Sequence, residues 1–127
     1  MAQKTKTVTQ LKKALWEECR RITKERYGNT CYTCRRTPLE GSNWHVGHFL
    51  TSSVCSMPLR YDLANLRPQC FACNIHKSGN WLAFESRLVE DEGQSYVDEL
   101  KQKNKDTLGG NYGRFWIEQK TEEYKSL

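Results

Sequence analysis

The sequence contains no long apolar run. No window approaches the roughly 20 consecutive apolar residues that a membrane-spanning helix needs, and the start of the chain, MAQKTKTVTQ, lacks the apolar stretch of a secretory signal peptide. These absences argue against a membrane protein and against secretion. We therefore expect an intracellular protein without a membrane partner, whose cysteines are reduced.

Apolar residues are scarce throughout. Of 127 residues, 37% are hydrophobic and 28% are charged, and the mean hydropathy is −0.82. A chain of this length can form one compact domain with a modest core. Where apolar burial is limited, metal binding or oligomerisation usually adds stability. The sequence shows no internal repeat and no low-complexity tract.

Acidic residues are outnumbered by basic ones. The chain has 15 Asp and Glu against 20 Lys and Arg, which gives a formal net charge of +5 and an isoelectric point near 8.9. This balance favours binding to a polyanion such as nucleic acid, although many basic proteins bind none.

The two ends of the chain have the pattern of helices, and the middle does not. Apolar residues recur at three- and four-residue spacing from Leu11 to Ile22, which predicts an amphipathic helix over residues 9–27, closed by Gly28. Residues 30–70 are rich in turn formers. Within them we interpret 43–50 as a strand and 54–70 as a loop. Further helices are expected at residues 81–90, 94–103 and 112–124.

Four of the six cysteines form two C-x-x-C pairs, Cys31 with Cys34 and Cys70 with Cys73. Two thiolate pairs of this spacing suit one tetrahedral Zn(II), because each short turn brings two sulfurs to one point. A redox-active C-x-x-C is typical of a thioredoxin-like unit, and disulfides are typical of an oxidising compartment. Neither setting fits this sequence, so we predict a structural zinc site.

Residues 35–69 separate the two pairs, which is more than the roughly 15 to 20 residues of a simple zinc ribbon. A folded insert is therefore expected between them. Cys19 is expected to be a small core residue of the first helix, and Cys55 a free thiol. Large aromatic residues should form the core around the zinc-held unit. They are Trp44, Phe49, Phe71, Trp81 and Phe84.

The insert and the second cysteine pair carry a recognisable pattern. The segments CYTC, HVGHF and NLRPQCFACNIHKSGN follow one another in the order that the HNH endonucleases use. From Cys31 to about Leu100 the sequence resembles this family, a branch of the ββα-metal nucleases, and within it most closely the NinG/Rap phage recombination proteins. The resemblance implies an α+β fold. A small zinc-stabilised ββα-metal (HNH) unit over 30–80 would be flanked by an N-terminal tail and helix over 1–29 and a C-terminal helical extension over 81–127.

The resemblance also implies catalytic roles. His48 would be the general base, and Asn65 would bond backbone across the loop and orient His48. Asn74 would bind a catalytic Mg(II) or Mn(II). These assignments suit phosphodiester hydrolysis, which needs a base that is neutral near pH 7 and a hard cation. Any one of these residues alone is usually a solvated or capping residue, so their joint spacing carries the interpretation.

The sequence departs from the family pattern directly before the base. Many members carry Asp or His there as a second metal ligand, and this chain has Gly47. His45 and His48 would lie on opposite faces of a regular strand, and a bulge at Gly47 would bring them together. We therefore name His45 as a candidate second ligand, the alternative being an exposed strand histidine. His76 is interpreted as phosphate-contacting or structural.

Basic residues surround the predicted nuclease unit. We expect them to contact DNA phosphates, which gives affinity and salt dependence but little sequence preference. The stronger candidates are Arg67 and Lys77, within the motif, and the weaker ones are Arg35, Arg36 and Arg60.

Together these features predict a metal-dependent endonuclease that hydrolyses DNA phosphodiester bonds. The likeness to NinG/Rap implies branched recombination intermediates such as Holliday junctions, in a phage or prophage protein of the host cytoplasm. Because such an enzyme cuts two strands, a homodimer is natural, with its interface among the helices after Trp81. Two alternatives stay open: an HNH nicking or double-strand endonuclease acting on ordinary duplex, and a non-catalytic zinc-dependent DNA-binding module.

Overall fold

The computed structural model describes residues 5–127, and the first helix is confirmed as α1, Val8–Tyr27. The Thr7 hydroxyl accepts a hydrogen bond from the Gln10 backbone N–H, and the Gln10 side chain accepts one from the Thr7 backbone N–H. This reciprocal cap satisfies N-terminal donors of the helix. Gly28 ends the helix with φ of 71°, a conformation that costs glycine little. Within the described residues, no helix combines the length and apolarity needed to cross a membrane.

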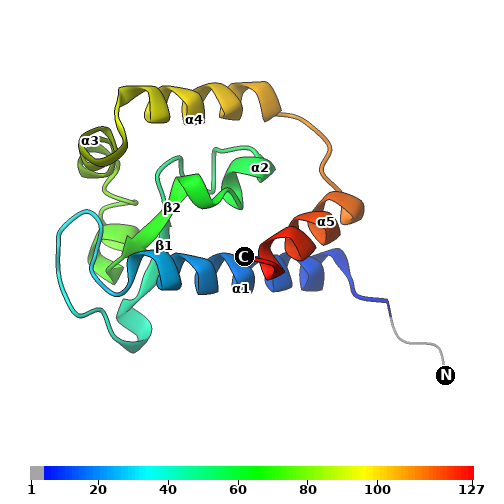
Figure 1. Cartoon of the computed structure of the whole chain (residues 1–127), viewed down its shortest axis with the longest axis horizontal. Helices are drawn as coiled ribbons and strands as arrows, with labels where there is room; N and C mark the ends of the chain where they lie inside the picture. The colour runs from blue at the N-terminus through cyan, green and yellow to red at the C-terminus, as the bar shows by residue number, and fades with distance from the viewer. Residues whose placement is uncertain (1–4) are drawn as a thin grey trace.

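The C-terminal half is helical, as expected. Helix α3 spans Trp81–Glu92, α4 spans Gln94–Thr107, and α5 spans Arg114–Lys125. Figure 1 shows α1 and α5 side by side along one edge of the molecule, with α3 and α4 along the opposite edge and the strands between them. The two ends of the chain therefore meet through α1 and α5.

The middle of the chain carries most of the short elements. The expected strand is confirmed as β1, His45–His48. Our interpretation of residues 54–70 as a loop is wrong, since they form a short helix α2, a 3₁₀ turn η2 and a second strand β2. The strand is four residues long and contains Pro68, which a two-stranded sheet tolerates because each strand keeps a free edge. The elements are η1 (Gly41–Asn43), α2 (Met57–Arg60), η2 (Leu63–Asn65), β2 (Leu66–Gln69) and the π-helical turn η3 (Ala72–His76).

The two strands pair antiparallel in an uninterrupted register. His45 lies opposite Gln69 and His48 lies opposite Leu66, with no extra residue at Gly47. The bulge considered at Gly47 is therefore absent. A different constraint acts there, because a Cβ at this position would lie 1.8 Å from the Gln69 Oε1 atom. Because Gly47 has no side chain, the Gln69 side chain can lie directly against the backbone of β1.

The sheet separates two hydrophobic clusters. One joins α1 and α5 to the sheet and the cysteine turns, and it contains the buried Cys19 that we expected in the core. The other joins α3 and α4 to the segments around β1 and α2, with Phe84 and Leu88 at its centre. The mixed helix and sheet content agrees with an α+β fold. The two strands therefore have one hydrophobic cluster on each side.

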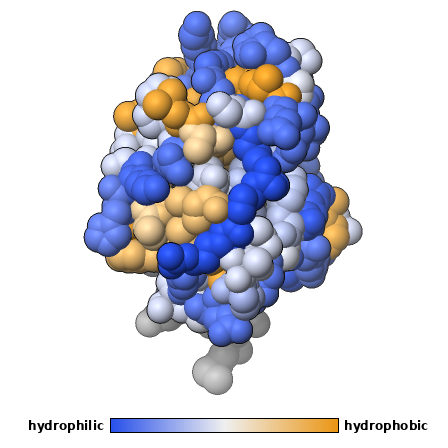
Figure 2. Space-filling view, turned by 90° about the vertical axis from the view of Figure 1, so that its left-hand side faces the viewer, coloured by the Kyte–Doolittle hydropathy of each residue, from blue (hydrophilic) through white to orange (hydrophobic). Residues whose placement is uncertain are grey.

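The aromatic residues divide between core and surface. Trp44, Phe49 and Phe84 are buried as predicted. Phe71 and Trp81 are not core residues, since they are 43% and 55% exposed. Phe71 directly precedes η3 and Trp81 begins α3, so they stand at the two ends of the turn that carries the buried Cys73. Figure 2, which views the α3 side of the molecule, shows separate apolar patches among largely hydrophilic neighbours.

Candidate functional site

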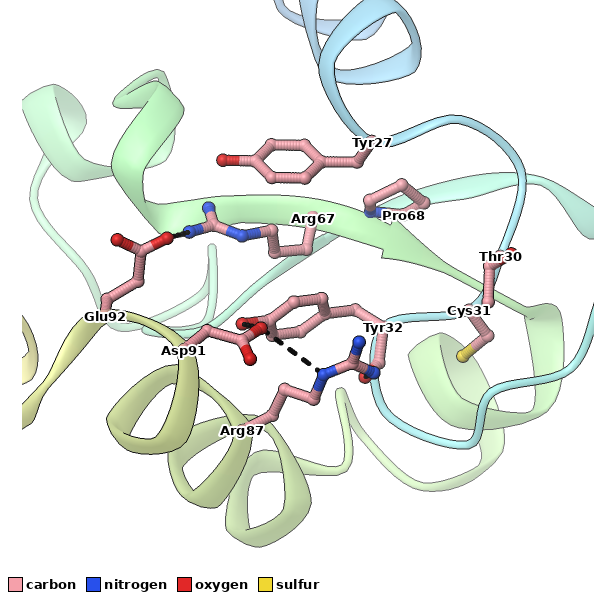
Figure 3. A pocket seen from close by; sticks show the side chains of 9 residues that line it. All are labelled: Tyr27, Thr30, Cys31, Tyr32, Arg67, Pro68, Arg87, Asp91 and Glu92. Atoms are coloured by element: carbon pink, nitrogen blue, oxygen red, sulfur yellow. Dashed lines mark hydrogen bonds and ion pairs between the residues drawn. The ribbon is translucent and has the colours of Figure 1, made fainter.

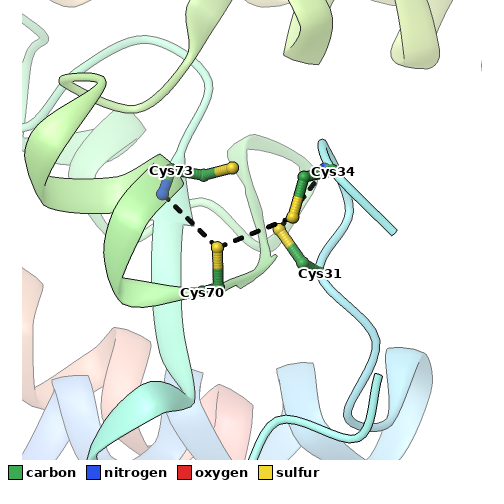
Figure 4. A group of neighbouring side chains, drawn as sticks. All are labelled: Cys31, Cys34, Cys70 and Cys73. Carbon is green, nitrogen blue, oxygen red and sulfur yellow. Dashed lines mark hydrogen bonds between the residues drawn. The ribbon is translucent and has the colours of Figure 1, made fainter. Parts of the chain in front are cut away.

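The four paired cysteines converge as the sequence predicted. One sulfur atom from each of Cys31, Cys34, Cys70 and Cys73 lies within 4.8 Å of the others. Figure 4 shows the two turns facing each other, and the Sγ atoms of Cys34 and Cys70 are 3.6 Å apart. A tetrahedral Zn(II) with bonds of about 2.3 Å spaces its sulfurs by about 3.8 Å. The donor set and the spacing therefore fit a structural zinc ion. We call these four residues the cysteine cluster.

Hydrogen bonds prepare the cysteine cluster for a cation. In each turn the backbone N–H of the second cysteine donates to the sulfur of the first, over 3.5 Å at Cys31 and 3.4 Å at Cys70. Burial alone would raise the pKa of Cys31, but the Thr33 hydroxyl and backbone donors outweigh it and lower the pKa to about 6. Burial raises the pKa of Cys34. The pocket thus favours the thiolate form at one sulfur, and a bound metal ion would supply the charge that stabilises the thiolate form of the others.

His48 lies at the end of β1, where the strand leaves the sheet. Its Nε2 atom is 2.9 Å from the backbone carbonyl oxygen of Arg60. The Trp16 ring from α1 stacks on the imidazole with a centroid distance of 5.3 Å and an interplanar angle of 6°. Burial, together with the nearby Arg60 charge, lowers the pKa of His48 below its ordinary value. The ring is thus fixed in orientation and neutral at pH 7.

Asn65 is fully buried and joins the two segments that hold His48. Its side-chain oxygen accepts from the Leu50 backbone N–H over 2.8 Å. Its amide nitrogen donates to the carbonyl oxygens of Leu50 and Leu59, each over 3.0 Å. Leu50 follows His48 in the chain, and Leu59 precedes the Arg60 carbonyl that contacts the ring. The bonding across the loop that we expected of Asn65 is the arrangement it adopts.

Asn74 and His45 contact each other beside the cysteine cluster. The Asn74 Nδ2 atom is 3.1 Å from His45 Nδ1, and His45 Nε2 is 2.8 Å from the Ser42 carbonyl oxygen. If His45 donates from Nε2 to Ser42, its Nδ1 accepts from Asn74, and the Asn74 amide oxygen is directed away from the ring. Both ring nitrogens of His45 are engaged in this way. The arrangement leaves the Asn74 oxygen as the better placed metal ligand.

A surface groove runs across His48. One hollow of about 260 Å³ is lined by His48 and Asn74 together with hydroxyl-bearing and small residues from 51–53 and 78–79. A second hollow of about 400 Å³ shares His48, Ser52 and Ser53 and extends to Trp16, Arg60 and Tyr61. We call the two together the histidine groove. His48 and Asn74, which come from separate elements, thus meet at one surface, and His45 is not part of its lining.

Arg67 is in the interior, which corrects our expectation that it contacts DNA. Its side chain is 1% exposed, and its guanidinium donates to the backbone carbonyls of Ala64 and Leu66 and to the Tyr96 hydroxyl. Figure 3 shows it between the rings of Tyr27 and Tyr32, at centroid distances of 4.5 and 5.3 Å. Desolvation acts against its charge, but the Tyr96 hydrogen bond and surrounding tyrosines raise its pKa. Arg67 therefore joins α1, β2 and α4 as a structural residue.

The other basic candidates lie at the surface. Lys77, Arg35 and Arg36 are exposed, as is His76 on the same turn as Lys77. Arg60 is half-buried in the wall of the histidine groove, nearer to His48 than its position in the sequence indicated. Sequence reasoning missed Trp16. It lies within the predicted first helix, and only the tertiary packing of α1 against the sheet brings its ring to His48.

The comparisons with known proteins agree with one another. The family model described as "NinG: Bacteriophage Lambda NinG protein" matches residues 1–126. "Protein ninG" of Escherichia phage 933W is 37% identical over 71 residues, which cover 56% of this chain and 34% of the relative. "Protein ninG" of Salmonella phage P22 is 36% identical over 75 residues, covering 59% and 36%. "Protein ninG" of Escherichia phage lambda is 35% identical over 71 residues, covering 56% and 33%.

The chain spans about a third of the length of the curated relatives it matches. No solved structure matches it.

Proposed function

Because this chain belongs to the NinG family, we propose that it is a metal-dependent DNA endonuclease of the HNH type. The observation that carries the proposal is the support of His48. One ring nitrogen is held by the Arg60 carbonyl, Asn65 ties together both segments that flank this contact, and Asn74 lines the same hollow. A solvated surface histidine has no need of a buried asparagine that fixes its surroundings. A general base does need such support.

The chain's own residues supply a proton acceptor. When His48 donates its Nε2 proton to the Arg60 carbonyl, the lone pair is on Nδ1, and that atom takes the proton from the attacking water. The lowered pKa of His48 keeps this lone pair available at neutral pH. Arg60 and the exposed Lys77, Arg35 and Arg36 would attract the phosphate backbone. Arg67 supports the strand from inside and takes no part in this attraction.

A catalytic cation would be held mainly by Asn74. Among the described residues, no carboxylate lines either hollow of the histidine groove, so the protein donors are neutral amide and hydroxyl oxygens. Mg(II) and Mn(II) accept such donors when water and phosphate oxygens complete their coordination. When bound, the ion would neutralise charge on the phosphoryl oxygens and the leaving group. The neutral lining predicts weak binding of the ion until DNA contributes its own oxygens.

The substrate we propose is branched DNA, such as a Holliday junction or a related recombination intermediate. The support is the resemblance of the CYTC, HVGHF and QCFACNIHKSGN segments to phage recombination nucleases of the NinG/Rap type. A junction is cut on two strands, so the active form would be a homodimer. Ordinary duplex is the alternative substrate, and a non-catalytic DNA-binding module is the alternative function.

The test is cleavage of a four-way junction and a matched linear duplex by the wild type and His48→Ala, with Mg(II) or Mn(II). We expect junction cleavage to exceed duplex cleavage and His48→Ala to lower the rate about 10²- to 10⁴-fold, the usual contribution of a general base. Gln119→Ala is the control, since Gln119 is exposed on α5 and is not part of the groove lining. Equal cleavage of both substrates would favour the duplex enzyme. Full activity in His48→Ala would mean that His48 is not the general base, and no cleavage by the wild type would favour the DNA-binding module.

A further inference from the structure

The two hollows of the histidine groove differ in chemistry. The hollow beside Asn74 presents amide and hydroxyl oxygens. The hollow on the other side of His48 presents the indole of Trp16, the ring of Tyr61 and the guanidinium of Arg60. Because the two share His48, Ser52 and Ser53, they form one continuous path across the ring. A strand whose phosphate reaches His48 from the Asn74 side can therefore continue over Trp16 and Arg60.

Arg60 carries a positive charge that the protein leaves uncompensated. Its Nη2 atom donates to the Ser52 carbonyl oxygen over 2.6 Å, and its buried Nε atom has no hydrogen-bond partner. Within residues 5–127 it forms no ion pair, whereas Arg21, Arg67, Arg87 and Arg114 each have a carboxylate within 4.0 Å. A fixed guanidinium that lines a hollow and has no carboxylate partner favours a phosphate as its partner.

The Trp16 ring forms the second feature of this hollow. It stacks on His48 and lies edge-on to Tyr61 at a centroid distance of 6.3 Å, so its orientation is fixed by two rings. Proteins that bind single-stranded nucleic acid combine an aromatic ring, on which a base stacks, with a positive charge that contacts the phosphate. The fixed indole of Trp16 beside the Arg60 guanidinium is such a combination. The ring comes from α1, outside the segment that resembles HNH nucleases.

We propose that the Trp16 and Arg60 half of the groove is a nucleotide subsite. It holds one nucleotide of the cleaved strand next to the scissile phosphate, with Arg60 on the neighbouring phosphate and Trp16 against the nucleoside between the two phosphates. This subsite rests on the proposed nuclease function. It also sharpens the substrate class, because a nucleotide packed on Trp16 must be separated from its pairing partner or loosely stacked, as at a branch point.

The first test pairs an altered protein with an altered substrate. In a series of oligonucleotides, a single uncharged methylphosphonate replaces one phosphate near the cut, at a different position in each. The wild type and Arg60→Ala are compared on this series, by binding affinity with Ca(II) and by single-turnover cleavage rate with Mg(II). At one position adjacent to the cut, we expect neutralisation to weaken wild-type binding roughly tenfold, as loss of one charge-assisted hydrogen bond would. Arg60→Ala should weaken binding of the unmodified oligonucleotide by the same factor. Neutralisation at that one position should then not weaken binding by Arg60→Ala any further, whereas neutralisation at the other positions should affect both proteins alike.

The matched control is Arg26→Ala, since Arg26 is exposed at the end of α1 and away from the groove lining. It should keep the wild-type interference pattern. If Arg60→Ala and neutralisation weaken binding additively at every position, Arg60 does not contact that phosphate and the subsite is wrong. If the wild type cleaves no DNA at all, the nuclease function itself is wrong.

The second test concerns Trp16. Substrates with an abasic nucleotide adjacent to the cut are compared for the wild type, Trp16→Phe and Trp16→Ala, after thermal melting has shown that the variants fold. We expect Trp16→Ala to weaken binding about tenfold, Trp16→Phe to retain most of it, and the abasic substrate to weaken the wild type but not Trp16→Ala. A loss that appears only in the cleavage rate, and equally on normal and abasic substrates, would mean that Trp16 merely orients His48. That result would overturn the subsite.

Discussion

The cysteine cluster and the histidine groove lie next to each other and are built in opposite ways. The cluster takes four identical donors from two short turns, and these donors alone can complete a tetrahedral site. The groove takes Trp16, His48, Arg60 and Asn74 from four separate elements, and its donors are too few and too neutral to hold an ion strongly. The cluster could therefore hold a metal that contributes to folding, whereas under the proposed function a metal at the groove would bind weakly and serve the reaction.

The two regions are joined through the chain itself. Cys73 of the cluster directly precedes Asn74 of the groove, and the Asn80 amide nitrogen lies 3.6 Å from the Cys73 sulfur. Gln69 donates to the Thr33 hydroxyl and to the Gly79 carbonyl oxygen, which links the first cysteine turn to the wall of the groove. Damage to the cluster should therefore disturb the groove, whereas damage to the groove should leave the cluster intact.

The largest expected effect comes from removing a zinc ligand. Cys70→Ser or Cys73→Ser should unfold the protein, because binding of a structural zinc contributes about 10 kcal/mol or more to folding in small domains. Circular dichroism with and without a zinc chelator measures this. Cys55→Ser is the matched control, since Cys55 lies outside the cluster and should be neutral. If a chelator left the melting curve unchanged, metal at the cysteine cluster would not contribute to folding.

The next effect concerns the buried support of His48. Asn65→Ala leaves the Leu50 N–H and the carbonyl oxygens of Leu50 and Leu59 without partners, so we expect a loss of about 2 to 4 kcal/mol in unfolding free energy. Cleavage should fall as well, at temperatures where the variant is folded. Asn104→Ala is the control, because Asn104 accepts from the Ser56 N–H of the same loop without approaching His48. Asn65→Ala activity that matches the Asn104→Ala control would argue against a role in orienting His48.

A smaller effect should separate the two interpretations of His45. If His45 only orients Asn74, His45→Ala should lower Mn(II) affinity and cleavage about tenfold, the value of one or two hydrogen bonds, and His45→Gln should restore part of both. Pulsed electron paramagnetic resonance of bound Mn(II) should then give the same nitrogen signal in the wild type and in His45→Gln. A nitrogen coupling that His45→Gln removes would establish His45 as a ligand, as the sequence allowed.

The smallest effect is a pH dependence at His48. Its pKa is lowered in the folded protein by burial, so the cleavage rate should fall on acidification with a midpoint below the ordinary value of about 6.5. The unfolded chain binds this proton more readily than the folded one, and stability should therefore decline as the pH drops below about 6.5. Trp16→Ala hydrates the ring and should move the kinetic midpoint upward. A midpoint above 6.5 in the wild type would contradict the burial of His48.

Much of the architecture could be predicted from short-range patterns. The helices α1, α3, α4 and α5 and strand β1 follow from apolar spacing and from glycines at their ends, which act over a few residues. Strand β2 was missed because its four residues include Pro68, and only pairing with β1 makes them a strand. Arg67 was misjudged for a related reason, since its position in the motif gave no sign of the tyrosines from three other segments that enclose it.

The sequence by itself determined the cysteine cluster, because the spacing within each C-x-x-C pair fixes the local geometry of two sulfurs wherever the pair lies. It also selected His48, Asn65 and Asn74 through their order in a known pattern. Only the tertiary structure decided what surrounds them. The packing of α1 against β2 and the path of the chain through α2 bring Trp16 and Arg60 to His48, and His45 lies beside Asn74 in a regular strand register at Gly47. These are contacts between distant segments, and no local spacing encodes them.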